Sequence, residues 1–247
     1  MCEKDGYGEL MVKGLPVVIT GLFAIFDPGV LTFWFVRPVV TPVRVYHIIW
    51  FLAVLVFIKR MTPRFNAKMS SGKVFESNFR STGADTERKR KAFRKTKKRA
   101  DSGAFRSGLY WTLLLVVMWA WRHVGMLSDV WIYVIVLFFV FMDQFCITVF
   151  CPFQWLIENK CCSTCRINNW GYCMALSPLI FIPTFWTYSV LLLSVLSVMQ
   201  WEYLYFKYPE RFYEIYNANL MCRNCRVQCR NKSNKNRANS PAISVDP

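Results

Sequence analysis

Residues 87–127 read ERKRKAFRKTKKRADSGAFRSGLYWTLLLVVMWAWRHVGML, so a strongly cationic run leads into a strongly apolar one. The apolar part, Leu109–Leu127, has the length that a helix needs to cross a hydrocarbon core about 30 Å thick. The cationic part is typical of a segment that stays on the cytoplasmic side of a membrane. This junction predicts an α-helical membrane protein and gives its orientation.

The same separation of apolar and basic residues extends over the whole chain of 247 residues. Hydrophobic residues make up 54% of it and mean hydropathy is +0.24, yet the formal net charge is +16. Residues 59–108 contain 16 Lys and Arg against 4 Asp and Glu, and residues 207–237 contain 8 against 2. Charge confined to such segments argues against a soluble nucleic-acid-binding domain and favours a bilayer protein.

Four apolar stretches have the character of membrane spans, namely Leu15–Val36, Val43–Ile58, Leu109–Leu127 and Val130–Phe150. Asp27-Pro28-Gly29 interrupts the first stretch and predicts a kinked or broken helix there. Residues 172–206 would form a helix of about 52 Å, which is too long for one simple span. They form either a hairpin of two short helices or an interfacial segment followed by one span. We therefore expect an all-α polytopic protein with four to six transmembrane helices.

The positive-inside rule places the basic loop in the cytoplasm, together with both termini. The basic C-terminal tail prefers the same side, which favours the hairpin over the single span. Pro209 would start a surface helix that turns Phe212, Ile215, Tyr216 and Leu220 toward the membrane. The expected order is a cytoplasmic N-terminus (1–14), a first hairpin (15–58), the basic loop (59–108), a second hairpin (109–157), a first Cys cluster (158–171), the long apolar segment (172–206), the surface helix with a second Cys cluster (207–230) and a disordered tail (231–247).

Two cysteine clusters flank the long apolar segment, and each contains a C-x-x-C. Two such pairs supply four thiolates, which suits tetrahedral zinc or an iron–sulfur cluster. The sequence does not distinguish these two groups. The expected ligands are Cys162, Cys165, Cys222 and Cys225, with Cys161, Cys229 and Cys173 as further candidates.

Several other interpretations of the cysteines stay open. Cys151, Cys161 and Cys162 are also candidates for S-palmitoylation beside a membrane. The thiols could equally be redox-active, separately bound or inert. We do not expect haem, because the two histidines, His47 and His123, are too few for the usual bis-histidine haem sites of a membrane cytochrome.

Ionisable residues within apolar stretches point to buried polar sites, since charge in a bilayer is costly. The candidates are Asp27, Asp143, His47 and His123. Asp143 would serve a proton or cation path, or anchor a polar cofactor. The plainer interpretation is an interhelical pair with Arg44, Arg122 or a histidine.

The basic run predicts contact with anionic lipid, to which each cation near the surface contributes about 1 kcal/mol. An acidic soluble protein is an alternative partner. Nucleic acid is an unlikely partner, because Phe93 is the one aromatic residue in the run and no stacking platform is present. The predicted lipid-binding residues are Arg88, Lys89, Arg90, Lys91, Arg94, Lys95, Lys97, Lys98 and Arg99.

These features predict an integral membrane protein with a cytoplasmic Cys-ligated centre that serves electron transfer or docks a partner. One alternative is a small transporter or channel-like protein that uses the intramembrane Asp residues. Another is a non-catalytic scaffold with a polybasic loop. The sequence lacks a Walker loop, a G-x-S-x-G elbow and an H-E-x-x-H helix, so it leaves open whether the chain is an enzyme.

Overall fold

The computed structural model describes residues 3–40, 43–62, 74–153 and 165–221, and these are mostly helical. Three of the described helices are long and apolar enough to cross a membrane: α4 (Glu87–His123), α5 (Asp129–Thr148) and α8 (Phe185–Lys207). A shorter apolar helix covers Leu10–Phe26. The prediction of an all-α membrane protein is confirmed at this level, and the count of four to six spans stays a prediction.

The first apolar stretch is divided into two helices at the Asp-Pro-Gly sequence. Helix α1 (Glu3–Phe26) ends there, and α2 (Pro28–Val36) begins with Asp27 as its N-cap. The Asp27 carboxylate accepts hydrogen bonds from the backbone N–H groups of Gly29 (3.0 Å) and Val30 (3.3 Å). Pro28 has no N–H to donate, so it fits the first position of a new helix.

A small β-hairpin and the third helix follow. Strands β1 (Pro38–Val40) and β2 (Val43–Arg44) pair antiparallel and lead into α3 (Val45–Met61). After α3, a 3-10 turn, η2 (Glu76–Asn78), precedes the basic run.

The second half of the predicted basic loop (59–108) is helical in the structure, because residues 87–108 belong to α4. Thr86 is the N-cap of α4 and accepts a hydrogen bond from the backbone N–H of Lys89. Arg, Lys and Ala dominate the run that follows, and all three are good helix formers. At 1.5 Å per residue, α4 is about 55 Å long, well beyond the roughly 30 Å of a hydrocarbon core.

The long apolar segment folds back on itself. Helix α7 (Arg166–Leu176) leads through η4 (Ser177–Phe181) into α8, and α7 packs against α8. Pro178 lies in the first turn of η4, and Thr184 caps α8 one residue after Pro183. This is the hairpin geometry, and the number of membrane crossings that it makes stays a prediction.

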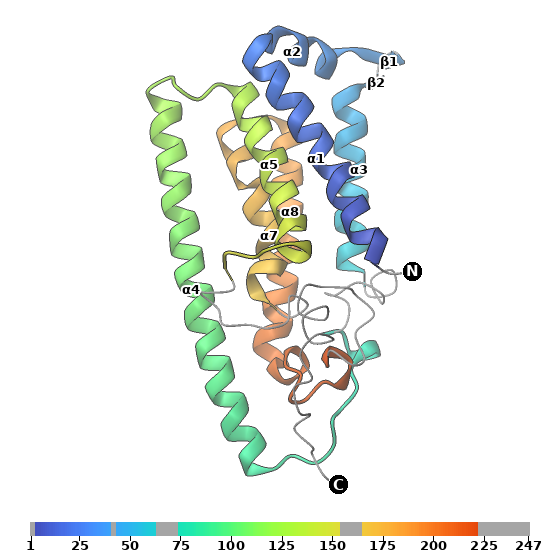
Figure 1. The fold of residues 1–247 in the computed structure, drawn as a ribbon, viewed down its shortest axis with the longest axis vertical. Coiled ribbons are helices and arrows are strands. Elements are labelled where there is room, and N and C mark those ends of the chain that lie inside the picture. Colours follow the sequence, from blue (N-terminus) through green and yellow to red (C-terminus); the bar gives the residue numbers. More distant parts are fainter. Residues whose placement is uncertain (1–2, 41–42, 63–73, 154–164, 222–247) are drawn as a thin grey trace.

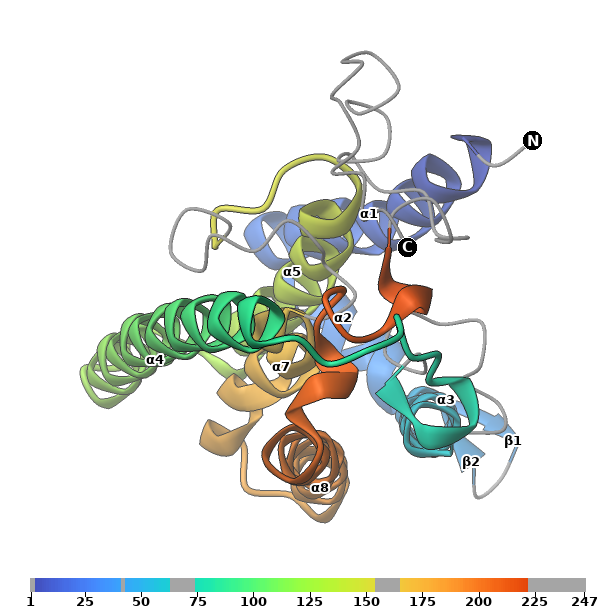
Figure 2. The same ribbon diagram turned by 90° about the horizontal axis from the view of Figure 1, so that it is seen from below.

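The helices form one bundle in which α1 packs on α5, α3 packs on α8, and α7 contacts both α5 and α8. In Figure 1, α1 starts toward one end of this bundle, and α3, α5 and α8 end toward it. We call this end the basic end. The first turns of α4 project beyond the other helices at the basic end. Viewed from below in Figure 2, α4 leans away from α3 and α8, and the C-terminal described segment lies between them.

The segment after α8 differs from the predicted surface helix. It contains two 3-10 turns, η5 (Pro209–Phe212) and η6 (Ala218–Leu220). Phe212 and Leu220 are each 1% exposed, and the Phe212 ring packs edge-on against Trp201 and Tyr205. These apolar side chains are buried in the protein and do not face lipid. The predicted tail, 231–247, lies outside the described residues.

The outer surface of the bundle is apolar. Phe51, Leu113, Trp119 and Leu192 are each more than half exposed, on α3, α4 and α8. Contiguous exposed apolar surface of this kind is rare on soluble monomers and normal on a lipid-facing bundle.

Candidate functional site: a clamped basic helix

The N-terminal half of α4 has an inner and an outer face. On the inner face, Lys89, Phe93 and Lys97 follow at intervals of four residues and are half-buried, and Ala104 and Ser107 are fully buried. This spacing places them on one side of a helix with 3.6 residues per turn. The remaining cations of the run point outward.

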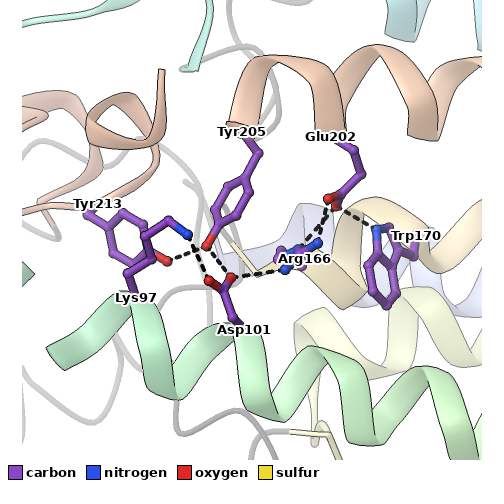
Figure 3. Close-up of polar contacts among 7 residues, drawn as sticks. All are labelled: Lys97, Asp101, Arg166, Trp170, Glu202, Tyr205 and Tyr213. Atoms are coloured by element: carbon purple, nitrogen blue, oxygen red, sulfur yellow. Dashed lines mark hydrogen bonds and ion pairs between the residues drawn. The ribbon is translucent and has the colours of Figure 1, made fainter. Parts of the chain in front are cut away.

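A polar network fixes the inner face of α4 to α7 and α8 at the basic end (Figure 3). Asp101 of α4 accepts hydrogen bonds from Lys97 (2.8 Å), Arg166 (2.9 Å) and the Tyr205 hydroxyl (2.6 Å). Arg166, the first residue of α7, also donates two hydrogen bonds to Glu202 of α8, at 3.2 and 2.5 Å. Two cations and two carboxylates therefore form a locally neutral network, which we call the clamp.

Aromatic side chains complete this network. The Trp170 indole N–H of α7 also donates to Glu202 of α8 (2.8 Å). The hydroxyls of Tyr205 and Tyr213 are 2.7 Å apart. Because Tyr205 already donates to Asp101, Tyr213 is the donor of this bond.

A second contact holds the start of α4 against the C-terminal segment. The Phe93 ring packs edge-on against Tyr213 and Tyr216, with centroid distances of 5.1 and 5.3 Å. The Tyr216 hydroxyl donates to Asp85 (2.8 Å), and Asp85 pairs with Arg90 (2.7 Å). Phe93 is therefore a packing residue and is turned away from the outer face.

The electrostatics follow from burial and pairing. Burial raises the pKa of Tyr213 to about 12. Burial alone would lower the pKa of Arg166, but the hydrogen bonds and charge of Glu202 outweigh it, so the pKa of Arg166 is raised. The hydrogen bond from Tyr216, followed by that from Arg90, lowers the pKa of Asp85.

The outer face of α4 is a cationic stripe, which we call the outer stripe. Its members are exposed, and within the described residues none of them forms an ion pair. The outer stripe consists of Arg88, Lys91, Arg94, Lys95 and Lys98. Four predicted lipid-binding residues lie outside this stripe: Lys89 and Lys97 face inward, Arg90 pairs with Asp85, and Arg99 is exposed nearer the apolar half of α4.

Asp143 lies in a separate polar cluster among α1, α3, α5 and α7. The charges of Arg60 and Lys13 act on its carboxylate, and Lys13 also donates to the neighbouring Gln144 (2.9 Å). The carboxylate lies directly against Gly171, where a Cβ atom would collide with it. Asp143 therefore lies beside Arg60 and Lys13, whereas Arg122, one of its expected partners, pairs with Asp129 (2.5 Å).

The remaining predicted intramembrane polar residues have local roles. Asp27 caps α2 at the end of the bundle opposite the basic end (Figure 1), so it does not share a site with Asp143. His47 accepts a hydrogen bond from the backbone N–H of Arg44 (2.9 Å) and packs on Trp186. His123 stacks on Trp119.

Of the four predicted core ligands, the structure describes Cys165 alone; Cys162, Cys222 and Cys225 lie outside the described residues, as do Cys161 and Cys229. Cys165 is the N-cap of α7 and lines a mostly apolar cavity of about 80 Å³ with Cys146, Cys151 and Asp143. Cys173, a further candidate, is half-buried and bonds to Ser194. Among the described residues no three His, Cys, Asp or Glu side chains are grouped so as to hold a metal.

Sequence reasoning did not identify the central residues of the clamp. Asp101, Glu202, Tyr205 and Tyr213 are not singled out by any motif in the sequence. One signal was present, since Asp101 and Glu202 are isolated acids at the basic ends of long apolar stretches. Apart from Lys97, their partners lie 32 to 104 residues away in the sequence and could not be paired from it.

Comparison with known proteins found no matching family model, no matching curated protein and no matching solved structure.

Proposed function

We propose that this chain is a membrane-anchored docking protein that presents the outer stripe of α4 to an acidic segment of a soluble protein on the cytoplasmic side. One observation carries the proposal: the cationic run is a clamped helix with its outer stripe exposed. A preformed helix loses little conformational entropy when a partner binds. Its cations at positions 88, 91, 95 and 98 also match the spacing of acids along one face of a partner helix.

The length of α4 favours a soluble partner over the protein's own lipid for the distal cations. If the span begins near Leu109, Lys91 lies about 27 Å further along the helix axis. The headgroup layer adds only about 5–8 Å, and charge is screened over about 8 Å in physiological salt. Arg99 and Arg106 are near enough to contact anionic headgroups, and Arg88 and Lys91 are not.

The inward position of Phe93 favours an acidic protein over a nucleic acid. Stacking of bases on exposed aromatic rings contributes much of the affinity of single-strand binders. The outer stripe has no such ring, because Phe93 packs against Tyr213 and Tyr216. Attraction by charge remains, and it suits a carboxylate-rich peptide.

The test measures binding of a fluorescent polyglutamate peptide to the full chain in zwitterionic nanodiscs. The double variant Lys91→Glu, Lys95→Glu reverses two charges on the outer stripe. The matched control Lys59→Glu, Arg80→Glu makes the same change in net charge at two exposed positions outside α4. We expect the first pair to weaken binding about tenfold or more and the control by less than about threefold.

Equal weakening by both pairs would show unspecific attraction and contradict the proposal. So would binding of vesicles containing anionic lipid, or of a single-stranded oligonucleotide, in strong preference to the peptide.

A shared cysteine centre remains a second proposal, supported by the path of the chain. The α7–α8 hairpin returns to the basic end, so the chain leaves α8 on the side from which Cys165 enters α7 (Figure 1). Metal analysis and an anaerobic absorption spectrum of the purified protein test it. Bound zinc or an iron–sulfur absorbance that Cys165→Ser reduces would support the centre, and metal-free, colourless protein would contradict it.

A further inference from the structure

A small polar cavity lies between α3, α7 and α8 at the basic end. Its volume is about 10 Å³, and its lining includes Arg60, Asn169, Ser197, Gln200 and Trp201. Asn169 is 4% exposed and Trp201 is 6% exposed. The cavity therefore lies beside two buried polar residues and is about the size of one water molecule.

Two of the residues that line this cavity each have a buried polar atom without a hydrogen-bond partner among the described residues. These atoms are Oδ1 of Asn169, which is an acceptor, and Nε1–H of Trp201, which is a donor. The orientation of the Asn169 amide is fixed, because its Nδ2 donates to the backbone carbonyl of Cys165 (3.0 Å). Leaving such groups without partners is costly, and native proteins rarely do so.

The two atoms together define what can bind. The occupant has to donate a hydrogen bond to Asn169 and accept one from Trp201. A small anion cannot donate, and a metal cation or an ammonium ion cannot accept. Larger molecules with both capacities do not fit into about 10 Å³.

We propose that this cavity is the binding site of a single ordered water molecule that bridges Asn169 of α7 and Trp201 of α8. Trp201 stacks on Tyr205 and packs against Phe212, next to the clamp. Arg60 lines the cavity and donates to the backbone carbonyls of Asn168 (3.3 Å) and Asn169 (3.4 Å). The water thus joins the α7–α8 hairpin at the point where the end of α3 meets it.

An experimental structure of the full chain, at a resolution that shows ordered waters elsewhere, tests the site directly. We expect a density peak within hydrogen-bonding distance of both Asn169 Oδ1 and Trp201 Nε1. A cavity without such a peak, or a direct hydrogen bond between the two side chains, would overturn the proposal.

A double-mutant cycle gives a second, independent test. Trp201→Phe removes the N–H and keeps an aromatic ring, and Asn169→Ala removes the acceptor. The two side chains are not bonded to each other, so a bridging water predicts coupling between them. We expect the effects on the unfolding equilibrium in detergent to differ from additivity about fivefold.

The control cycle combines Asn169→Ala with Trp121→Phe, whose indole is exposed on α4. This cycle should be additive within about twofold. Additivity in the Trp201 cycle as well would count against the water bridge.

Discussion

Arg166 links three helices with one side chain. Its side chain, 14% exposed, extends from the first turn of α7, and the guanidinium group is shared between Asp101 of α4 and Glu202 of α8. A planar group with five donors can serve two carboxylates at once, which a lysine ammonium cannot do with the same geometry. Removal of this side chain leaves two partly buried carboxylates to compete for Lys97 and the tyrosines.

We predict that Arg166→Ala lowers the free energy of unfolding by about 2 kcal/mol, less than for a fully buried pair because Asp101 is partly exposed. Arg166→Lys should recover part of this loss. The control is Arg122→Ala, whose ion pair with Asp129 is more exposed and should contribute less than about 1 kcal/mol. Thermal unfolding in detergent micelles measures all three variants, and equal losses for Arg166→Ala and Arg122→Ala would contradict the clamp.

Gly171 is required by the close approach of Asp143. A Cβ atom at this position would overlap the Asp143 carboxylate and push it away from Arg60. We predict that Gly171→Ala destabilises the protein by about 1–3 kcal/mol, as overpacking of a core typically does. Gly21→Ala is the matched control, because no atom lies within 4 Å of the added Cβ and alanine favours a helix. Chemical denaturation in micelles should separate the two variants, and a neutral Gly171→Ala would be incompatible with this packing.

At the level of elements, the start of α4 is attached to the C-terminal segment by Asp85, Tyr216 and paired backbone. The Thr82 N–H donates to the Tyr216 carbonyl (3.2 Å), and the Ala218 N–H donates to the Arg80 carbonyl (2.7 Å). The carboxylate of Asp85 accepts more strongly from Tyr216 when it is ionised, and only then does it form an ion pair with Arg90. This attachment should therefore depend on pH.

The sign of the effect follows from the lowered pKa of Asp85. Its contribution is present above the ordinary carboxyl value of about 3.9 and is lost as pH falls through the lower pKa of the folded state. We predict that protection of the Thr82 and Ala218 amides from hydrogen exchange, corrected for intrinsic rates, decreases below about pH 4. The variant Asp85→Asn should show, at every pH, the weaker amide protection that the original chain shows below about pH 4. Protection that is independent of pH in the original chain would contradict the role of Asp85.

The elements were partly predictable from the sequence. Apolar length identified α4, α5 and α8, and Asp27-Pro28-Gly29 marked the break between α1 and α2 because its chemistry is local. The basic run was predicted as a loop from its charge, although its residues favour a helix when one face can be packed. The helix predicted after Pro209 is absent because Phe212 and Leu220 find partners in the protein core, which depends on tertiary contacts.

At the level of the whole molecule, an apolar bundle is combined with a basic helix that is held at one end of it. The bundle supplies an apolar outer surface, and the clamp holds the helix that projects from it (Figures 1 and 3). The outer stripe could be predicted as a cationic surface, because charge is visible in sequence. Which cations stay exposed depends on Phe93, Lys97 and Asp101 facing inward, and the sequence alone did not show this.

The continuity of α4 is the central claim, since it decides whether the cations lie on the membrane or beyond it. Pulsed electron–electron distance measurement between labels introduced by genetic code expansion at Lys91 and Trp121, in nanodiscs, tests it most directly. Both positions are exposed, and a continuous helix separates them by about 45 Å. A narrow distribution near this value is the predicted result. A broad distribution centred below about 35 Å would mean that the basic run folds back on the membrane, and it would contradict the account.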